Sequence, residues 1–120
     1  MVGLMVILTH APFGHENAFA GLYTALAAQT KNVESIVILR MDGVYAGLKG
    51  QEDPMAKIHL PSTEDVVNDF VGLDGKVYAE SESLSNRAIK VGDLIEGVVE
   101  LDAIAIEKLI LDQGERIVVF

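Results

Sequence analysis

The sequence predicts an α/β domain of three layers, in which a five-stranded parallel sheet lies between helices. Two nearly continuous apolar runs, at residues 2–9 and 33–41, are typical of parallel strands covered on both faces. Segments with the apolar spacing of a helix separate these strands from later strand-like runs. Such alternation along one chain favours right-handed crossovers and a single parallel sheet.

Turn and capping residues mark the boundaries of the expected elements. Pro12, Gly43, Gly50, Gly75 and Gly114 interrupt the apolar patterns, as proline and glycine commonly do. Strands are expected at residues 2–9, 33–41, 76–79, 98–99 and 116–120, the last of them buried. Helices are expected at residues 15–29, 44–49, 62–71, about 83–88 and 102–113, with Ser62 and Asp102 as capping residues. Residues 51–61 are expected to form a surface loop.

Length and composition indicate one soluble domain that spans residues 1–120. Half of the residues are hydrophobic and 22% are charged, which suits an ordinary globular protein with a substantial core. The longest apolar run is too short to cross a membrane. Met1 is followed at once by strand-like sequence, without the features of a targeting segment, so we expect a cytoplasmic protein. The slight apolar excess favours an interface between subunits.

Charge and cysteine content exclude several functions. The net charge of −9 repels phosphate backbones and therefore disfavours direct binding of nucleic acid. The chain contains no cysteine, which excludes disulfides, thiolate metal sites, nucleophilic thiols and persulfides on this chain. No metal-ligand spacing stands out, and no cofactor is expected.

A cleft is expected beyond the C-terminal ends of the strands, where open parallel sheets form their sites. The segments that reach this edge are residues 9–15, 41–43, 80–87 and 100–102. The candidate cleft residues are Thr9, His10, His15, Asp42, Gly43, Glu80, Ser81, Ser83 and Arg87. None of them is assigned as catalytic, and His59 is treated as a surface residue.

Each candidate has a structural and a functional interpretation. His10 and His15 could act as acid–base groups, because histidine titrates near neutral pH, or could be ordinary polar loop residues. The serines after Glu80 could cap the helix that follows, or Glu80 could be a general base with a raised pKa. Arg87 could hold an anion or pair with Glu82 or Glu80.

Several common enzyme motifs are missing. No GxGxxG follows the first strand, and the sequence contains neither GxxxxGK[ST] nor GxSxG. These absences argue against a dinucleotide fingerprint, a P-loop and the common esterase pattern. The first strand ends in Thr9-His10 without the acidic cluster of a phosphoacceptor receiver.

Three segments taken together resemble the DsrE/DsrF-like sulfur-relay proteins, and most closely their DsrF/TusC branch. The resemblance rests on Thr-His-Ala-Pro-Phe-Gly at residues 9–14, Asp-Gly-Val-Tyr at 42–45 with Leu-Lys-Gly-Gln at 48–51, and Val-Tyr-Ala at 77–79 leading to Arg87. The closing residues 112–120 are also similar to the family's last strand. The resemblance implies a three-layer fold with a five-stranded parallel sheet, assembled as trimers or as hexamers of two trimers.

The resemblance fails at the residue that carries the family's chemistry. Such complexes pass persulfide sulfur between cysteines, towards 2-thiouridine in tRNA or in sulfur oxidation. Counting back from Arg87 places the family's loop cysteine at Glu80, and a carboxylate cannot form a persulfide. Ala88 also replaces the glycine that usually follows the arginine.

Two functions therefore follow as hypotheses, and the chain is not expected to be a sulfurtransferase by itself. The first is a non-catalytic subunit of a DsrEFH/TusBCD-like relay, bound to DsrE- and DsrH-like paralogues whose cysteine carries the sulfur. The alternative is a homo-oligomer, trimeric or hexameric, that binds a small ligand in a cleft around Glu80. The sequence does not distinguish tRNA thiolation from sulfur oxidation. A third, weaker alternative is a module that docks to partners through its acidic face.

Overall fold

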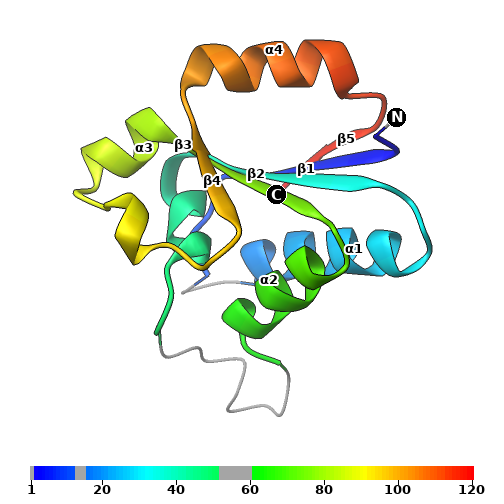
Figure 1. Cartoon of the computed structure of the whole chain (residues 1–120), viewed down its shortest axis with the longest axis horizontal. Helices are drawn as coiled ribbons and strands as arrows, with labels where there is room; N and C mark the ends of the chain where they lie inside the picture. Colours follow the sequence, from blue (N-terminus) through cyan, green and yellow to red (C-terminus); the bar gives the residue numbers. More distant parts are fainter. Residues whose placement is uncertain (1, 13–15, 52–60) are drawn as a thin grey trace.

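Five strands form one sheet in the computed structural model, which describes residues 2–12, 16–51 and 61–120. Their order across the sheet is β4-β3-β2-β1-β5, and every neighbouring pair is parallel (Figure 1). The strands are β1 Leu4–Leu8, β2 Ser35–Leu39, β3 Lys76–Glu80, β4 Val98–Leu101 and β5 Ile117–Val119. The predicted five-stranded parallel sheet is confirmed.

Helices cover both faces of the sheet, which confirms the three layers. The helices α1, Asn17–Thr30, and α2, Thr63–Gly72, lie on one face, and α4, Ala103–Gln113, lies on the other (Figure 1). Side chains of a strand alternate between faces, so each of the central strands contributes to two cores. Val37 faces the α1 and α2 side, whereas Ile38 packs beneath Ile106 of α4.

The central strands are apolar throughout because both of their faces are covered. All five residues of β2 are buried, and so are four of the five residues of β1. This arrangement explains why the two long apolar runs of the sequence predicted their strands well. Burying such side chains contributes roughly 25 cal/mol for each Å² of apolar surface removed from water.

The helix caps predicted at Ser62 and Asp102 are both confirmed. The Ser62 side chain accepts a hydrogen bond from the backbone N–H of Asp65 at 3.1 Å, at the start of α2. The Asp102 carboxylate accepts one from the N–H of Ala105 at 2.7 Å, at the start of α4. Each contact pairs one of the backbone N–H groups that a helix leaves unbonded at its N-terminus.

Three short helical segments lie beyond the C-terminal end of the sheet. They are the 3₁₀ helix η1, Met41–Gly47, the helix α3, Ser81–Asn86, and the 3₁₀ turn η3, Val91–Asp93. The helix expected at residues 44–49 therefore begins three residues earlier and is a 3₁₀ helix. Gly50, predicted to follow it, adopts a left-handed φ of 77°. Most of the loop expected at residues 51–61, with His59, lies outside the described residues.

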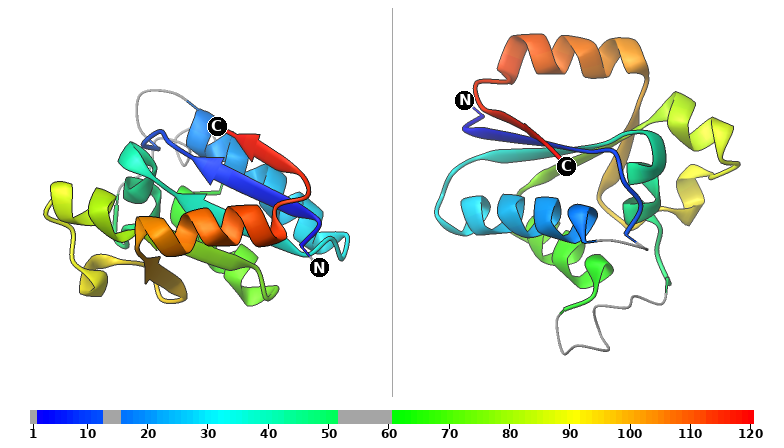
Figure 2. Two further views of the ribbon diagram at one scale, coloured as in Figure 1. Left: turned by 90° about the horizontal axis from the view of Figure 1, so that it is seen from above. Right: turned by 180° about the vertical axis from the view of Figure 1, so that it is seen from behind.

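The prediction of a buried last strand is wrong. β5 lies at the edge of the sheet and pairs only with β1, and the exposed fractions of Ile117, Val118 and Val119 are 42%, 38% and 61%. Seen from above, α4 lies across the sheet without covering β5 (Figure 2). An apolar run resembles a central strand whether or not a neighbour covers it, which is why the sequence misled here.

No helix among the described residues combines the length and the apolar character that a membrane crossing requires.

Candidate functional site

Gly43 allows the first segment of the site to lie directly against the end of β1. A Cβ at this position would overlap the backbone carbonyl of Leu8, so only glycine fits without a shift. The same carbonyl accepts a hydrogen bond from the N–H of Arg40 at 2.9 Å, and the Arg40 carbonyl accepts one from Gly43 at 2.8 Å. These contacts fix the turn that follows β2 and therefore the direction of the Arg40 side chain.

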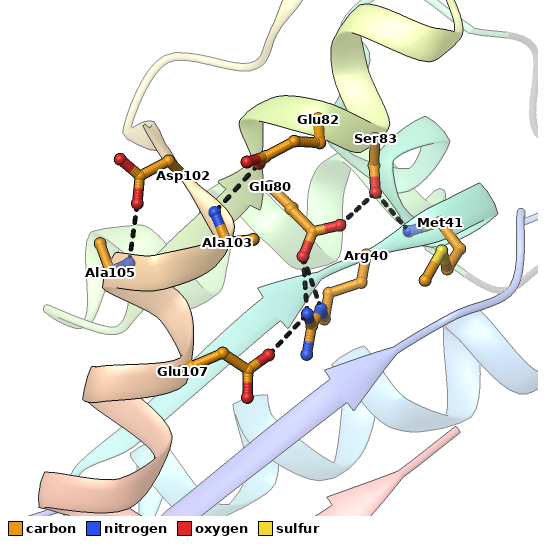
Figure 3. A network of polar contacts seen from close by, with 9 residues as sticks. All are labelled: Arg40, Met41, Glu80, Glu82, Ser83, Asp102, Ala103, Ala105 and Glu107. Atoms are coloured by element: carbon orange, nitrogen blue, oxygen red, sulfur yellow. Dashed lines mark hydrogen bonds and ion pairs between the residues drawn. The ribbon is translucent and has the colours of Figure 1, made fainter.

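Glu80 is the centre of the site. It ends β3, immediately precedes α3, and is only 4% exposed. One carboxylate oxygen, Oε2, lies 2.8 Å from both Nε and Nη2 of Arg40, and the other, Oε1, accepts a hydrogen bond from the Ser83 hydroxyl at 2.6 Å (Figure 3). A buried carboxylate is costly unless it is paired, and here each oxygen has a partner.

Ser83 connects Glu80 to the turn after β2. Its hydroxyl donates to Glu80 and accepts a hydrogen bond from the backbone N–H of Met41 at 2.9 Å. Ser83 is 2% exposed and lies inside α3, which begins at Ser81. The interpretation of Ser83 as a cap of the following helix is therefore wrong, because α3 starts two residues earlier than predicted and has no side-chain cap.

Arg40 and Glu107 are the members of this network that sequence analysis missed. Nη2 of Arg40 donates to Oε1 of Glu107 on α4 at 2.7 Å, so one guanidinium holds a carboxylate from β3 and another from α4 (Figure 3). Arg40 is the next-to-last residue of the apolar run 33–41 and the only charged residue of the run's second half. That position at a strand end was the available signal.

Electrostatics keep the Arg40 guanidinium charged. Partial burial alone acts to lower its pKa, but the hydrogen bonds and negative charges of Glu107 and Glu80 outweigh burial, so the pKa of Arg40 is raised. A cation with a raised pKa contributes its stabilisation at every pH below its ordinary pKa and loses it only in strong base. The network therefore keeps this positive charge across the neutral range.

Arg87 pairs with Asp42, and not with Glu80 or Glu82. Its Nε and Nη2 lie 3.0 Å from Oδ1 of Asp42, and its Nη1 donates to the backbone carbonyl of Ser83 at 3.1 Å. The arginine thereby ties the end of α3 to η1. The site residues Asp42, Gly43, Glu80, Ser83 and Arg87 are thus brought together from two neighbouring strand ends.

The remaining candidates lie at the end of β1 or at the surface. The Thr9 hydroxyl donates to the backbone carbonyl of Phe120 at 3.0 Å and lies 3.3 Å from Nδ1 of the exposed His10. Ser81 opens α3 and is partly exposed. His15 lies outside the described residues.

The arrangement of this site is that of a closed polar network. Grooves of about 390, 350 and 310 Å³ lie elsewhere, and none of these three is lined by Arg40, Glu80, Ser83 or Arg87. Among the described residues no group of three or more histidines and carboxylates is placed to hold a metal ion. The chemistry available at Glu80 is therefore ionic and hydrogen-bonding contact, which joins β2, β3, η1 and α4.

Known proteins share features of both the sequence and the fold of this chain. A model of the DsrE/DsrF-like family matches residues 3–120. The chain belongs to the DsrE/DsrF-like family. This family is related to sulfur relay, and the match extends over both the sheet and the β3–α3 junction that carries Glu80.

Two curated proteins are similar in sequence to this chain. The chain is 32% identical over 92 residues to the uncharacterized protein MJ0989 of Methanocaldococcus jannaschii, covering 77% of each protein. It is 30% identical over 95 residues to the uncharacterized protein MK0008 of Methanopyrus kandleri, covering 79% of this chain and 75% of the relative.

Solved structures share the same fold. The ychN protein of E. coli superposes with a TM-score of 0.87 at 22% identity, with all of both chains covered. The protein MTH1491 of Methanobacterium thermoautotrophicum, also covered in full, gives a TM-score of 0.75 at 14% identity. At such identities the likeness establishes the three-layer architecture of a DsrE/DsrF-like protein.

Proposed function

We propose that this DsrE/DsrF-like chain is a non-catalytic subunit of a sulfur-relay assembly of the DsrEFH or TusBCD kind. In this proposal a cysteine on a paralogous partner carries the sulfur as a persulfide. The observation that carries the proposal is Glu80: it occupies the position where the sequence resemblance places the family's cysteine, and it is buried and fully paired.

The first support is chemical. A persulfide is a sulfur atom bound to a cysteine thiolate, and the thiolate is the only side chain that can attack sulfane sulfur in this way. The chain has no cysteine, so it cannot carry sulfur covalently. A role in the relay must then lie in holding or shaping the partner that does.

The second support is the state of the Glu80 carboxylate. A general base needs a free lone pair directed at the proton it removes. Arg40 donates hydrogen bonds to one oxygen of Glu80 and Ser83 donates one to the other, and the side chain is almost inaccessible to solvent. This pairing favours a structural role for Glu80 over the alternative of a ligand-binding cleft with a carboxylate base.

The proposal includes assembly with related chains. The resemblance to the DsrF/TusC branch suggests DsrE- and DsrH-like partners in trimers or hexamers, in the cytoplasm. The exposed apolar residues at the end of the sheet that carries the site suit such contacts: Met41 is 53% exposed and Val91 is 55% exposed. Burial of these side chains against a partner would place that partner beside η1 and η3.

Co-expression tests the proposal. The chain is produced with tagged DsrE-like and DsrH-like proteins and should copurify with them in a fixed ratio. Val91→Asp at the site end of the sheet should weaken copurification. Leu73→Asp should not weaken it. Leu73 is 44% exposed and follows α2 just before β3 begins, so it lies at the N-terminal end of the strands, away from the site. A homo-oligomer that ignores both partners, or sulfane sulfur found on this chain alone, would overturn the proposal.

A further inference from the structure

Helix α4 carries an apolar stripe that the chain itself does not cover. Ile104 is 81% exposed and Leu111 is 84% exposed, although both are large aliphatic residues. On the opposite side of the helix, Ile106 is inaccessible to solvent and packs in the core. Exposure of two such apolar side chains to water on one helix is unfavourable. We call Ile104 and Leu111 the apolar stripe, which extends along most of α4.

The stripe is straight and has charges of opposite sign on its two flanks. Residues seven apart on a helix differ by only about 20° in direction, so Ile104 and Leu111 point almost the same way. Glu107 and Lys108 lie between them, each roughly 50° to either side of the stripe. Both charged side chains are exposed.

This pattern is complementary to itself in one orientation only. When two helices associate side by side in the same direction, each left flank faces the other's right flank, so Glu107 faces Lys108 of the second copy. When they run in opposite directions, Glu107 faces its own equivalent and Lys108 faces its own equivalent. Like charges at such contacts are unfavourable. The charges therefore favour the parallel arrangement.

We propose that copies of this chain associate through α4, with their helices parallel around a rotation axis. Ile104 packs on Ile104 of the second copy, and Leu111 packs on Leu111 of the second copy. Glu107 pairs across the interface with Lys108. A two-fold axis and a three-fold axis give the same contacts. In both cases the flank of α4 that carries Glu107 faces the flank of the neighbouring α4 that carries Lys108.

Two further features of the molecule suit this interface. A further exposed apolar residue lies near the end of α4, because Ile117 on the open edge strand lies beside Gly114 and is 42% exposed. Glu107 uses one oxygen to hold Arg40, and its other oxygen has no hydrogen-bond partner among the described residues. The interface would thereby adjoin the Arg40–Glu80 network from the outside (Figure 3).

This association goes beyond the proposed relay function and does not depend on sulfur chemistry. A chain that failed to bind DsrE-like and DsrH-like partners but still associated through α4 would overturn the relay role alone. A chain that bound those partners without any self-association through α4 would overturn this inference alone.

The first test measures mass against concentration by analytical ultracentrifugation. The native chain should associate, and Ile104→Gln and Lys108→Glu should each raise the dissociation constant at least about tenfold. Their matched controls are Leu73→Gln, another exposed aliphatic residue, and Lys31→Glu, which changes the net charge equally and lies at the far end of α1. The controls should leave the dissociation constant unchanged, and circular dichroism confirms that every variant is folded.

The second test uses the absence of native cysteine to determine the direction of the helices. Under mild oxidation, Ile104→Cys alone should give disulfide-linked dimers, and so should Leu111→Cys alone. An antiparallel contact would instead link the two variants only when they are mixed. A native chain that stays monomeric, an association that the α4 variants leave unaffected, or cross-links confined to the mixture would overturn the inference.

Discussion

Arg40 and Glu80 form an ion pair across 40 residues of sequence, with Nε of the arginine 2.8 Å from Oε2 of the glutamate. The Glu80 side chain is 5% exposed and that of Arg40 is 21% exposed, so the pair is only partly screened by solvent. It joins the ends of two neighbouring strands, β2 and β3. Together with the hydrogen bond from Ser83 it holds the Glu80 carboxylate in a fixed structural contact.

Glu80→Ala should destabilise the fold by about 2–3 kcal/mol. The substitution leaves a partly buried guanidinium with one exposed partner and deprives the Ser83 hydroxyl of its acceptor, and both effects are unfavourable. Urea unfolding followed by circular dichroism measures the loss. Asp42→Ala is the control, because its pair with Arg87 is 61% exposed on the aspartate side and should contribute less than about 1 kcal/mol. Equal effects of the two substitutions would contradict the structural role of Glu80.

The sequence predicted those parts of the fold that depend on local patterns. The continuous apolar runs identified β1 and β2, because strands covered on both faces need apolar side chains throughout. The caps at Ser62 and Asp102 were predictable because a cap is a contact over three residues. The same reasoning about strand ends selected residues 41–43 and 80–87, which lie at the C-terminal ends of β2 and β3.

Contacts between distant residues could not be predicted in the same way. Arg40 reaches Glu107 across 67 residues, and nothing in the local sequence of either residue indicates the other. The partner of Arg87 was sought among nearby glutamates, whereas it is Asp42 on a different strand end. The exposure of β5 depends on where α4 lies over the sheet, which is a property of the whole fold.

Ala88→Gly should stabilise the protein by about 1 kcal/mol. α3 ends in a Schellman motif, in which the N–H of Ile89 bonds to the Leu84 carbonyl at 3.0 Å and Ala88 adopts a φ of 54°. This left-handed conformation strains an alanine but not a glycine, and the exposed methyl group gains no packing in return. The midpoint of urea unfolding should rise. Asn32→Gly, at the equivalent position after α1 with a φ of 62°, should change it less, because asparagine tolerates this region.

Gly43→Ala should destabilise the protein by roughly 2 kcal/mol or more, the range of a steric clash in a packed interior. The added Cβ would overlap the carbonyl of Leu8, so η1 and the Arg40 side chain that it positions would have to move. Thermal unfolding measures the loss. In the control, Gly72→Ala, the new methyl group meets nothing within 4 Å and improves helix propensity at the end of α2, so stability should hold or rise. A Gly43→Ala protein as stable as the control would show that η1 does not need this close approach.

Glu80→Cys should create a thiol whose pKa Arg40 lowers, relative to the same thiol without that arginine. The substitution removes one of the two carboxylates that pair with Arg40, and the guanidinium then lies near the new sulfur and favours its thiolate form. The ultraviolet absorbance of the thiolate, followed against pH, measures the pKa without a reagent having to reach the buried sulfur. Ser85→Cys, on the exposed side of α3, provides the reference titration. Arg40→Gln in the Glu80→Cys background should raise the pKa of the thiol. If the thiol titrates alike with and without Arg40, the arginine does not act on this position, and the site would lack the positive charge that a reactive cysteine at Glu80 would need.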